Sequence, residues 1–437
     1  MRLATFFLAA ALSAGVLTSA ATPARAAPAD PQARAVAAIA ASPAFKTAAA
    51  TLAAEHERTV ADIVTLTEIP APPFKETERA RAYAEMFRAH GLSDVEIDPE
   101  GNVLGLRKGA ARDAVKRPLV VIAAHLDTVF PEGTDVTVRR EGTKLMAPGV
   151  GDDTRSLAVL LAYVRALDAA KIRTRSDILF VGNVGEEGPG DLRGVRYLFT
   201  QGKYKDRIGA FFSMDGSDAS RVVTGGVGSK RYRVTFKGPG GHSYGAFGLV
   251  NPMTAMAGAV QGLYRIEAPA APRTTYSASV AGGGTSVNSI PNEVWTDFDM
   301  RSESAEALAR LETQFRQAVD EAVAAENAAR STRFGPVSAE YVLIGDRPAG
   351  ATPADAAIVR ATLAAISAQG YEPQTQSSST DSNLPMSLGI PAVTIGSGGV
   401  GGRAHALDEW IDVAQPESTR GMTAGLLALL AVAGVER

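Results

Sequence analysis

Short apolar runs alternate with helical periodicities along most of this chain, and the alternation predicts an α/β fold. The clearest buried strands are the apolar runs at residues 119–123, 178–181, 208–212 and 392–395. Amphipathic segments at 156–169, 195–200 and 355–369 read as helices between them. Because strands that alternate with helices usually run parallel, we expect a mostly parallel central sheet flanked by helices.

The N-terminal part predicts helices before the sheet begins. Residues 27–60 are rich in alanine and read as helical, ending near His56, and residues 76–90 form an amphipathic pattern stopped by Gly91. Residues 95–106 predict a hairpin. His56 and His90 lie on these helices, away from strand ends, so we expect both to be ordinary surface residues.

The pattern changes near Gly225 and predicts a second domain inserted into the first. Tyr232, Val234 and Phe236 alternate with basic and polar neighbours, which is typical of a half-exposed antiparallel strand. Further strands are predicted at 274–280, 293–300 and 337–344, and helices at 253–266 and 305–327. We expect one domain formed by residues 27–228 and 347–437, with an inserted α+β lid or dimerisation domain at 229–346.

Composition limits the class of protein. A chain of 437 residues exceeds one ordinary core, which agrees with two domains. The net charge of −3, without a basic stripe, argues against nucleic acid as a partner. The absence of cysteine excludes disulfides, a thiol nucleophile and cysteine–zinc sites.

Residues 1–26 have the pattern of a secretory signal peptide. Arg2 gives a positive start, residues 3–17 are apolar, and the segment 24–26 reads Ala-Arg-Ala, a typical cleavage site. The alternative is an N-terminal membrane anchor, but the apolar run is short for a span, which needs about 20 residues. We expect export to the periplasm or secretion after cleavage near Ala26, without stable membrane association.

Residues that can bind a divalent metal follow the predicted strands one after another. They are His125, Asp127, Asp152, Glu186, Glu187, Asp215 and His405. Ligands of open α/β sheets collect outside the carboxyl ends of the strands, so these side chains are expected to meet. Imidazole and carboxylate groups are common ligands of zinc and similar ions. The pattern predicts a metallohydrolase.

Most of these positions also have a simpler interpretation. The acidic pair at 152–153 could cap the next helix, Asp215 could serve a turn, and His405 could lie on a surface loop. The pair 186–187 is more specific, because one carboxylate can bind a metal while its neighbour stays free as a general base. It is the ordered series that favours a metal site.

Two other classes of protein are alternatives. Residues 241–245 match the G-x-S-x-G elbow of serine hydrolases, with Ser243 at its centre, and His405 follows it. That elbow should leave a buried strand and enter a helix, whereas a half-exposed strand and Pro239-Gly240 precede it here. The other alternative is a non-catalytic binding protein, disfavoured because Glu186 and every expected ligand are present.

The ordered motifs resemble the M20 family of metallopeptidases, from about residue 60 to the C-terminus. The matching segments are HLDT, GDD, GEEG, MDG, GPGGHS, NSIPN followed by DMRS, and a C-terminal GG..H. The chain is most similar to the tripeptide-aminopeptidase-like branch. The resemblance implies an α/β catalytic domain that carries two divalent metal ions, usually zinc, with manganese or cobalt as alternatives. It also implies an inserted lid that often mediates dimerisation.

The resemblance further implies a set of metal ligands. His125 and Glu187 resemble terminal ligands of different metals, and Asp152 resembles the carboxylate that bridges them. Asp215 would join His125, and His405 would join Glu187. A cis peptide bond is implied after Asp152.

Catalytic and substrate-binding roles come from the same resemblance. Glu186 is similar to the general base, and Asp127 to the residue that orients the neighbouring histidine or tunes the base. His242 would stabilise the tetrahedral oxyanion, across a dimer interface if a partner subunit supplies it. Asn288 and Arg301 match lid positions that bind the substrate carboxylate or backbone.

One position departs from the family pattern, since relatives commonly carry lysine after the paired acids and this chain has Thr154-Arg155. We expect a metal-dependent exopeptidase, with aminopeptidase preferred because aspartate stands at 215, as in the peptidase branch. Carboxypeptidase and N-acyl amino acid deacylase activities stay open, since lid pockets decide specificity. The expected substrates are short peptides or N-acyl amino acids, and the expected assembly is a homodimer through the inserted domain.

Overall fold

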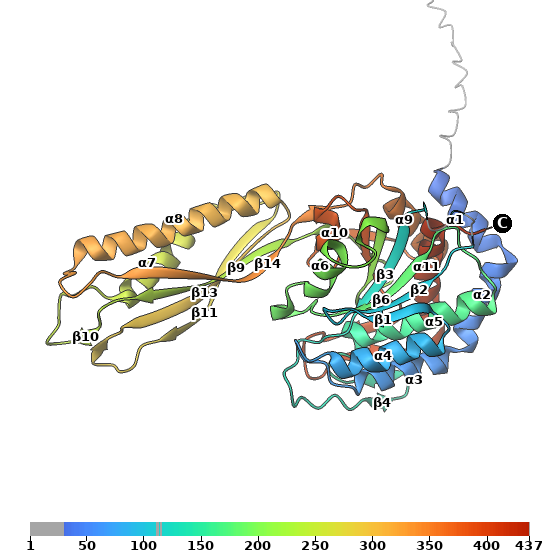
Figure 1. Cartoon of the computed structure of the whole chain (residues 1–437), viewed down its shortest axis with the longest axis horizontal. Helices are drawn as coiled ribbons and strands as arrows, with labels where there is room; N and C mark the ends of the chain where they lie inside the picture. The colour runs from blue at the N-terminus through green and yellow to red at the C-terminus, as the bar shows by residue number, and fades with distance from the viewer. Residues whose placement is uncertain (1–29, 111–112, 114–115, 437) are drawn as a thin grey trace, which may run out of the picture.

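The protein consists of a broad α/β body and a narrow extension that projects from one side of it (Figure 1). The computed structural model describes residues 30–436 except 111, 112, 114 and 115. The expected signal segment, residues 1–26, lies outside the described residues. The chain enters the extension along β9 (Gly228–Lys237) and returns along the neighbouring strand β14 (Ser338–Arg347).

Within the described residues, a nine-stranded sheet forms the centre of the α/β body. Its middle strands, in the order β6, β3, β7 and β17, run parallel, while antiparallel strands pair with them on both sides. The expected α/β class is confirmed, with a mixed sheet whose centre is parallel. The strands across the sheet are β1 (Ser93–Ile97), β2 (Val103–Arg107), β6 (Ile178–Asn183), β3 (Leu119–His125), β7 (Ile208–Met214), β17 (Ala392–Ile395), β8 (Arg221–Gly226) and β15 (Gly350–Ala351), with β16 (Gln374–Ser378) beside β8.

Both faces of this sheet are buried, which explains why its central strands read as unbroken apolar runs. In β3, Val120 and Ile122 face one hydrophobic core, while Val121 and Ala123 face a second core. Alternate side chains of a strand point to opposite faces, so every position of the run must be apolar. The first core packs against α4 (Thr77–Ala89), α5 (Arg155–Ala169), α9 (Ala357–Ala368) and α11 (Gln415–Ala433), and the second against α6 (Arg193–Thr200) and α10 (Asn383–Ser387).

The alanine-rich N-terminal segment differs from the prediction of one helix that ends near His56. It forms three helices, α1 (Pro31–Ala41), α2 (Pro43–Ala54) and α3 (His56–Thr67). Ser42 separates the first two, because its hydroxyl caps α2 by accepting the N–H of Phe45 at 3.2 Å. No single described helix is long and apolar enough to cross a membrane. Helices α1 and α2 meet that criterion only together, and they are bent by 68°.

The prediction that His56 is a surface residue was wrong. Its exposed fraction is 6%, because it starts α3 on the same face as Val60 and Ile63. Burial lowers the pKa of His56, so the neutral ring fits this apolar face. His90, at the end of α4, is half-buried and lies 3.0 Å from a guanidinium nitrogen of Arg165.

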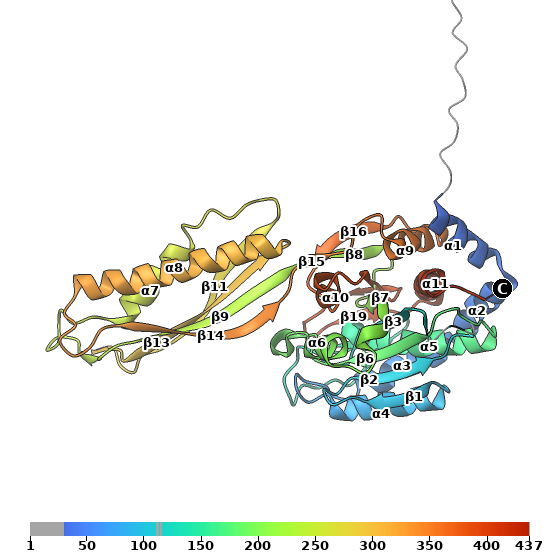
Figure 2. The same cartoon turned by 45° about the horizontal axis from the view of Figure 1, so that its top comes forward.

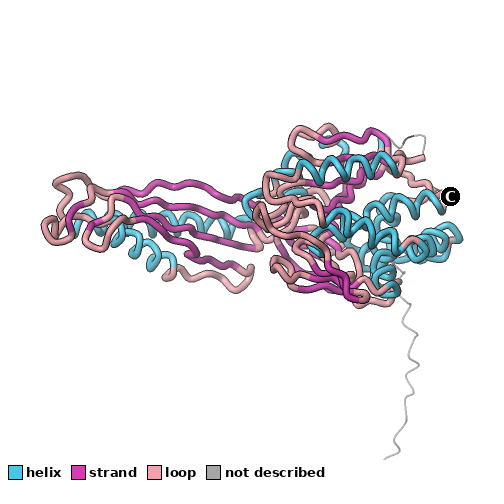
Figure 3. Tube along the Cα trace, turned by 90° about the horizontal axis from the view of Figure 1, so that it is seen from below, coloured by secondary structure: helices cyan, strands magenta, loops and turns pink. Residues whose placement is uncertain are grey.

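The extension is an α+β layer with its own hydrophobic core. An antiparallel sheet in the order β11, β13, β9 and β14 carries two helices on one face (Figure 3). The apolar positions of β9, such as Val234 and Phe236, face these helices, while Arg231, Arg233 and Lys237 stay half-exposed on the other face. The remaining elements are α7 (Pro252–Leu263), β11 (Thr274–Gly283), β13 (Glu293–Ser302) and α8 (Ala305–Ala329).

Two small sheets complete the described structure. The extension is seen from a second direction in Figure 2. At its end far from the α/β body, β10 (Gly241–His242) pairs with β12 (Ser289–Ile290) (Figure 1). In the α/β body, short strands pair in the order β18, β19, β5 and β4. Their bounds are β4 (Arg139–Glu141), β5 (Lys144–Met146), β18 (Val400–Gly402) and β19 (Trp410–Asp412). These strands were not predicted from the sequence, because each is only two or three residues long.

Candidate functional site

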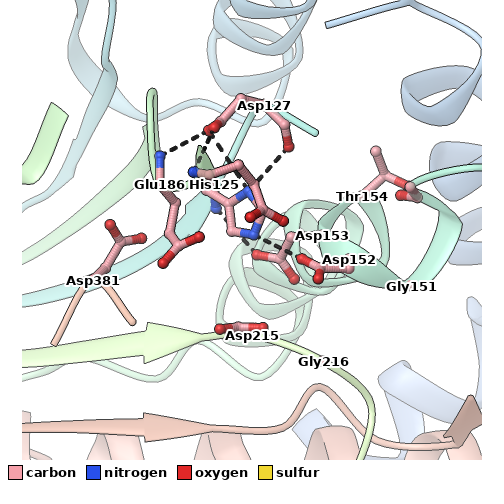
Figure 4. Close-up of polar contacts among 12 residues, drawn as sticks. His125, Asp127, Gly151, Asp152, Asp153, Thr154, Glu186, Asp215, Gly216 and Asp381 are labelled. Atoms are coloured by element: carbon pink, nitrogen blue, oxygen red, sulfur yellow. Dashed lines mark hydrogen bonds and ion pairs between the residues drawn. The ribbon is translucent and has the colours of Figure 1, made fainter. Parts of the chain in front are cut away.

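Acidic and histidine side chains converge where the parallel strands of the α/β body end (Figure 4). The carboxyl ends of β3, β6 and β7 lie side by side because these strands are parallel neighbours. The turn before α5 and the loop between β18 and β19 complete the set. The expected residues that meet here are His125, Asp127, Asp152, Glu186, Glu187, Asp215 and His405.

Asp152 lies between the two histidines of this cluster. Its Oδ1 is 2.9 Å from Nε2 of His125, and its Oδ2 is 3.2 Å from Nε2 of His405. Glu187 Oε1 lies 2.9 Å from the same nitrogen of His405. One carboxylate therefore reaches two potential metal ligands with different oxygens, a geometry in which it could be shared by two cations. The peptide bond between Asp152 and Asp153 is cis, as the resemblance implied.

The carboxylates around the two histidines favour positive charge on the imidazole rings. Burial lowers the pKa of His125, but its contacts with Asp127 and Asp152 prevail and raise it well above the usual value. Hydrogen bonds with Asp152 and Glu187 raise the pKa of His405 to about 10. The cluster therefore stabilises positive charge at its centre. Protons on the histidine rings or bound metal ions can supply that charge.

The donor atoms suit two neighbouring metal ions. They form overlapping groups, and within each group the ligand atoms lie within 4.8 Å of one another. One group contains Asp152, Glu187 and His405. A second group contains His125, Asp153 and Asp215. Imidazole nitrogen and carboxylate oxygen are appropriate donors for zinc, manganese and cobalt. The second group contains Asp153, which was not among the ligands expected from the sequence. Its Oδ2 also accepts the backbone N–H of His125 at 3.1 Å.

Asp127 contacts both His125 and the acidic turn after β6. Its backbone oxygen is 3.0 Å from Nδ1 of His125, which must donate there, so Nε2 remains available as a metal donor. Its buried carboxylate accepts the backbone N–H of Glu186 at 3.1 Å and that of Glu187 at 2.8 Å. Asp127 therefore holds the two adjacent glutamates in place through their backbone.

Glu186 faces a buried arginine at the junction between the two bodies. Arg347, the last residue of β14, donates from Nη1 to Glu186 Oε1 at 3.1 Å and from Nη2 to the carbonyl oxygen of Glu186. Burial raises the pKa of Glu186 well above its usual range, and the charge of Arg347 offsets only part of this effect. A carboxyl group that ionises less readily than usual can exchange a proton near neutral pH.

Three buried charged residues beside the cluster were missed by the sequence analysis: Arg347, Asp381 and Glu409. Asp381 accepts a hydrogen bond from Nδ2 of Asn183 at 2.8 Å, and burial raises the pKa of Asp381 to about 7. It follows β16, and Glu409 precedes β19; neither strand has the long apolar run that revealed β3. The sequence therefore held no strong signal for either position.

A cavity of about 610 Å³ opens beside the cluster and reaches the extension. Its wall includes Arg231 of β9 and Arg301 of β13. These two side chains share Asp299, to which their Nε atoms donate at 3.0 and 2.7 Å. Two guanidinium groups and one carboxylate leave a net positive charge on this wall, which suits a substrate carboxylate. Arg301, expected to bind substrate, thus lines the same cavity as the cluster of acidic and histidine side chains.

The structure does not bring His242 or Asn288 to the cluster of the same chain. Both lie at or beside the β10–β12 pair at the far tip of the extension (Figure 1), where the backbone N–H of Ser243 donates to the carbonyl of Asn288 at 2.9 Å. Nδ1 of His242 accepts the backbone N–H of Tyr244 at 3.2 Å, which leaves Nε2 as the proton donor of the neutral ring. Both residues are exposed and lie close together. They could reach the cluster of a partner subunit, or that of their own chain after a large closure of the extension.

Ser243 lies in this same exposed tip. A turn follows it instead of a helix, and the strand before it has only two residues. His405 belongs to the α/β body, in the loop between β18 and β19, whereas β10 lies at the far tip of the extension (Figure 1). The geometry therefore gives no support to the serine-hydrolase alternative.

An open α/β sheet with a carboxylate and histidine cluster at its carboxyl edge, and with an inserted α+β extension, defines a metal-dependent hydrolase. The family model described as Peptidase family M20/M25/M40 matches residues 121–432, and the chain belongs to this family. The protein is therefore a hydrolase that acts on peptide or amide bonds.

Solved structures share the fold at low sequence identity. A tripeptidase from Staphylococcus aureus subsp. aureus Mu50 is 20% identical, with a TM-score of 0.70, and the match covers 86% of this chain and 98% of that one. Aminopeptidase PepT from Bacillus cereus ATCC 10987 is 18% identical, with a TM-score of 0.69 and coverage of 86% and 99%. The YXEP protein of Bacillus subtilis, a dinuclear metal binding peptidase from the M20 family, is 17% identical, with a TM-score of 0.62 and coverage of 87% and 98%.

Proposed function

We propose that the protein is a metal-dependent exopeptidase of short peptides with aminopeptidase specificity. The observation that carries the proposal is the position of Asp152 between His125 and His405, with Glu187 on the second histidine and Glu186 beside them. The proposed cofactors are two divalent ions, zinc in the first instance and manganese or cobalt as alternatives. The proposed ligands are His125, Asp152, Glu187, Asp215 and His405.

Such ions, when bound, acidify a water molecule and polarise the scissile carbonyl group. Glu186 would take a proton from the attacking water and pass it to the nitrogen of the leaving amine as the C–N bond breaks. Asp127 holds the backbone of Glu186, and Arg347 fixes the direction of its carboxylate. His242 of a partner subunit would donate a hydrogen bond to the oxyanion.

The lid side of the cavity supports recognition of a free substrate carboxylate. Arg231 and Arg301 face the cavity with one shared counter-charge, Asp299. In a dipeptide or tripeptide the C-terminal carboxylate lies close enough to the first peptide bond to reach such an anchor. The same anchor would serve a carboxypeptidase or an N-acyl amino acid deacylase, and the two arginines favour these activities as the second candidate.

Export and dimerisation are part of the proposal. The signal pattern of residues 1–26 supports export to the periplasm or secretion. The separation of His242 and Asn288 from the cluster of their own chain supports a homodimer whose extensions complete each other's sites.

Metal removal tests the proposal. Purified protein without residues 1–26 should lose hydrolysis of di- and tripeptides after chelation, and zinc, manganese or cobalt should restore it, because the attacking water needs the ions. Release of free N-terminal residues, lost when the N-terminus is blocked, would establish an aminopeptidase. Cleavage only of blocked or acylated substrates would establish the second candidate. Activity that persists after verified metal removal would contradict both.

Replacement of Arg301 tests the carboxylate anchor. In Arg301→Met we expect KM to rise about 10- to 100-fold with little change in kcat, since a charge-assisted hydrogen bond contributes about 1.5–3 kcal/mol. Steady-state kinetics with a tripeptide and with its C-terminal amide would measure the effect. The unchanged enzyme should have a high KM for the C-terminal amide, and the substitution should barely change that KM. An equal rise in KM for both substrates would contradict the anchor.

A further inference from the structure

Glu409 is a buried carboxylate that none of the proposed catalytic steps uses. Its exposed fraction is 2%, and it lies four positions after His405 in the loop that leads into β19. Both of its oxygens face the turn that carries Asp152. Oε2 accepts the backbone N–H of Gly149 at 2.9 Å, and Oε1 accepts those of Gly151 and Asp152 at 2.8 Å each.

The backbone of Glu409 adds a further link between the same two segments. Its carbonyl oxygen accepts the N–H of Ala147 at 3.1 Å, and its own N–H donates to Ala406 at 3.0 Å. The loop of His405 and the turn of Asp152 are therefore joined by four hydrogen bonds to one residue. These segments are more than 250 positions apart in the chain, so local sequence alone cannot fix their distance.

The turn at residues 149–152 has a backbone that needs external support. Gly149 has φ of 77°, and Asp152 has φ of −119° and ψ of 87°, so no regular helix satisfies these amides. The side chain of Glu409 approaches so closely that a Cβ on Gly151 would lie 3.0 Å from its Oε1 and 2.9 Å from Ile411. Glycine at 151 thus makes room for the carboxylate.

A buried negative charge next to an acidic cluster is costly unless hydrogen bonds compensate it. Three hydrogen bonds from backbone N–H groups offset part of that cost here. An apolar residue would avoid the cost of burial, but it would leave three amides without an acceptor. The side chain fits an ordering role: it sets where Asp152 stands relative to His405.

We infer that Glu409 is a positioning residue that fixes the Asp152 turn against the His405 loop, so that the ligand group of Asp152, Glu187 and His405 is assembled before metal enters. The inference rests on the proposed metal centre. Pre-ordered ligands bind a metal more tightly, because binding does not have to order them.

Zinc titration of the metal-free protein tests this role. In Glu409→Gln, the amide nitrogen must oppose one backbone N–H, so the turn loses an acceptor while the side-chain shape stays nearly the same. We expect one of the two zinc equivalents to bind about 10- to 100-fold more weakly, as for other residues that hold metal ligands in place. The expected kcat is low at limiting zinc and recovers with added zinc, while KM stays unchanged.

Asp408→Asn is the matched control, because it makes the same chemical change one position earlier. The Asp408 side chain is 66% exposed and pairs with Arg403 at 3.0 Å, outside the ligand cluster. The Asp408→Asn protein should bind two zinc equivalents with the affinities of the unchanged protein. Glu409→Gln with unchanged affinity for both equivalents would overturn the inference. Failure of the unchanged protein to bind zinc would instead overturn the proposed metal centre.

A second variant keeps the test decisive if Glu409→Gln does not fold. Gly151→Ala changes no charge and no titratable group, but its methyl group pushes the turn away from Glu409 and Ile411. We expect the same weakening of one zinc equivalent, with the circular dichroism of the metal-free protein unchanged. Wild-type zinc affinity in a folded Gly151→Ala protein would overturn the inference.

Discussion

Glu186→Gln is expected to lower kcat by roughly 10²- to 10⁴-fold, the usual contribution of general acid–base catalysis. Glutamine keeps the shape of the side chain and can still accept the hydrogen bond from Arg347, but it cannot take a proton. The backbone N–H bond to Asp127 is also unaffected. The ligand cluster should therefore persist, and steady-state kinetics combined with zinc analysis would show a large kcat defect with full metal content.

Glu187→Gln is the informative comparison, since the two glutamates are adjacent and equally buried. Its carboxylate contacts His405, so this variant should lose metal as well as activity. Added zinc should restore part of the activity of Glu187→Gln and none of that of Glu186→Gln. Full activity in metal-loaded Glu186→Gln would contradict the role of Glu186 as general base.

Mixing two inactive variants should restore activity if the extension completes the site of a partner subunit. In His242→Ala we expect kcat to fall about 10²- to 10³-fold, comparable to the loss of one oxyanion donor. When it is refolded or exchanged with Glu186→Gln, each mixed dimer has one site with both native residues. Random pairing then restores about a quarter of all sites, because half the dimers are mixed and each has one such site.

The same mixing experiment distinguishes two models: His242 acts on the site of the partner subunit, or it acts on the site of its own chain. If each extension folded back on its own body, every site in a mixed dimer would lack either Glu186 or His242, and mixing would restore nothing. His242→Ala mixed with Arg301→Met tests which other lid residues act within their own chain. Activity of the His242→Ala and Glu186→Gln mixture that stays at the level of the two separate variants, in a sample shown to be dimeric, would contradict the shared site.

The sequence predicted the centre of the fold because burial on both faces leaves a distinct pattern. β3 and β17 were found because every residue of both strands is buried and their runs are apolar, apart from Thr394 in β17 and His125 at the end of β3. The short strands β5, β18 and β19 were not found, because they pair over only three residues and most of these residues are partly or fully exposed. The N-terminal helices were predicted by type but not by number, since alanine favours a helix without showing where Ser42 ends it.

The candidate site was predictable wherever a ligand follows a strand in the chain. His125, Glu187 and Asp215 each follow an apolar run, so the topology of a parallel sheet implies that they meet. Arg347 and Glu409 could not be assigned in this way, because their partners are backbone and side-chain atoms far away in the sequence. His242 could be named from its motif, but no local pattern shows that it lies at the far end of the molecule.

The strands that join the extension to the α/β body form a lever. Within the described residues the chain crosses this junction only between β8 and β9 and between β14 and β15. β9 has ten residues, so its length is about 33 Å at roughly 3.3 Å per residue, and a turn of about 10° at its base would displace the tip by about 6 Å. Small rotations at the junction therefore become large excursions of His242. Arg347 lies at this junction and donates a hydrogen bond to Glu186, so the same rotation would also move the Glu186 carboxylate.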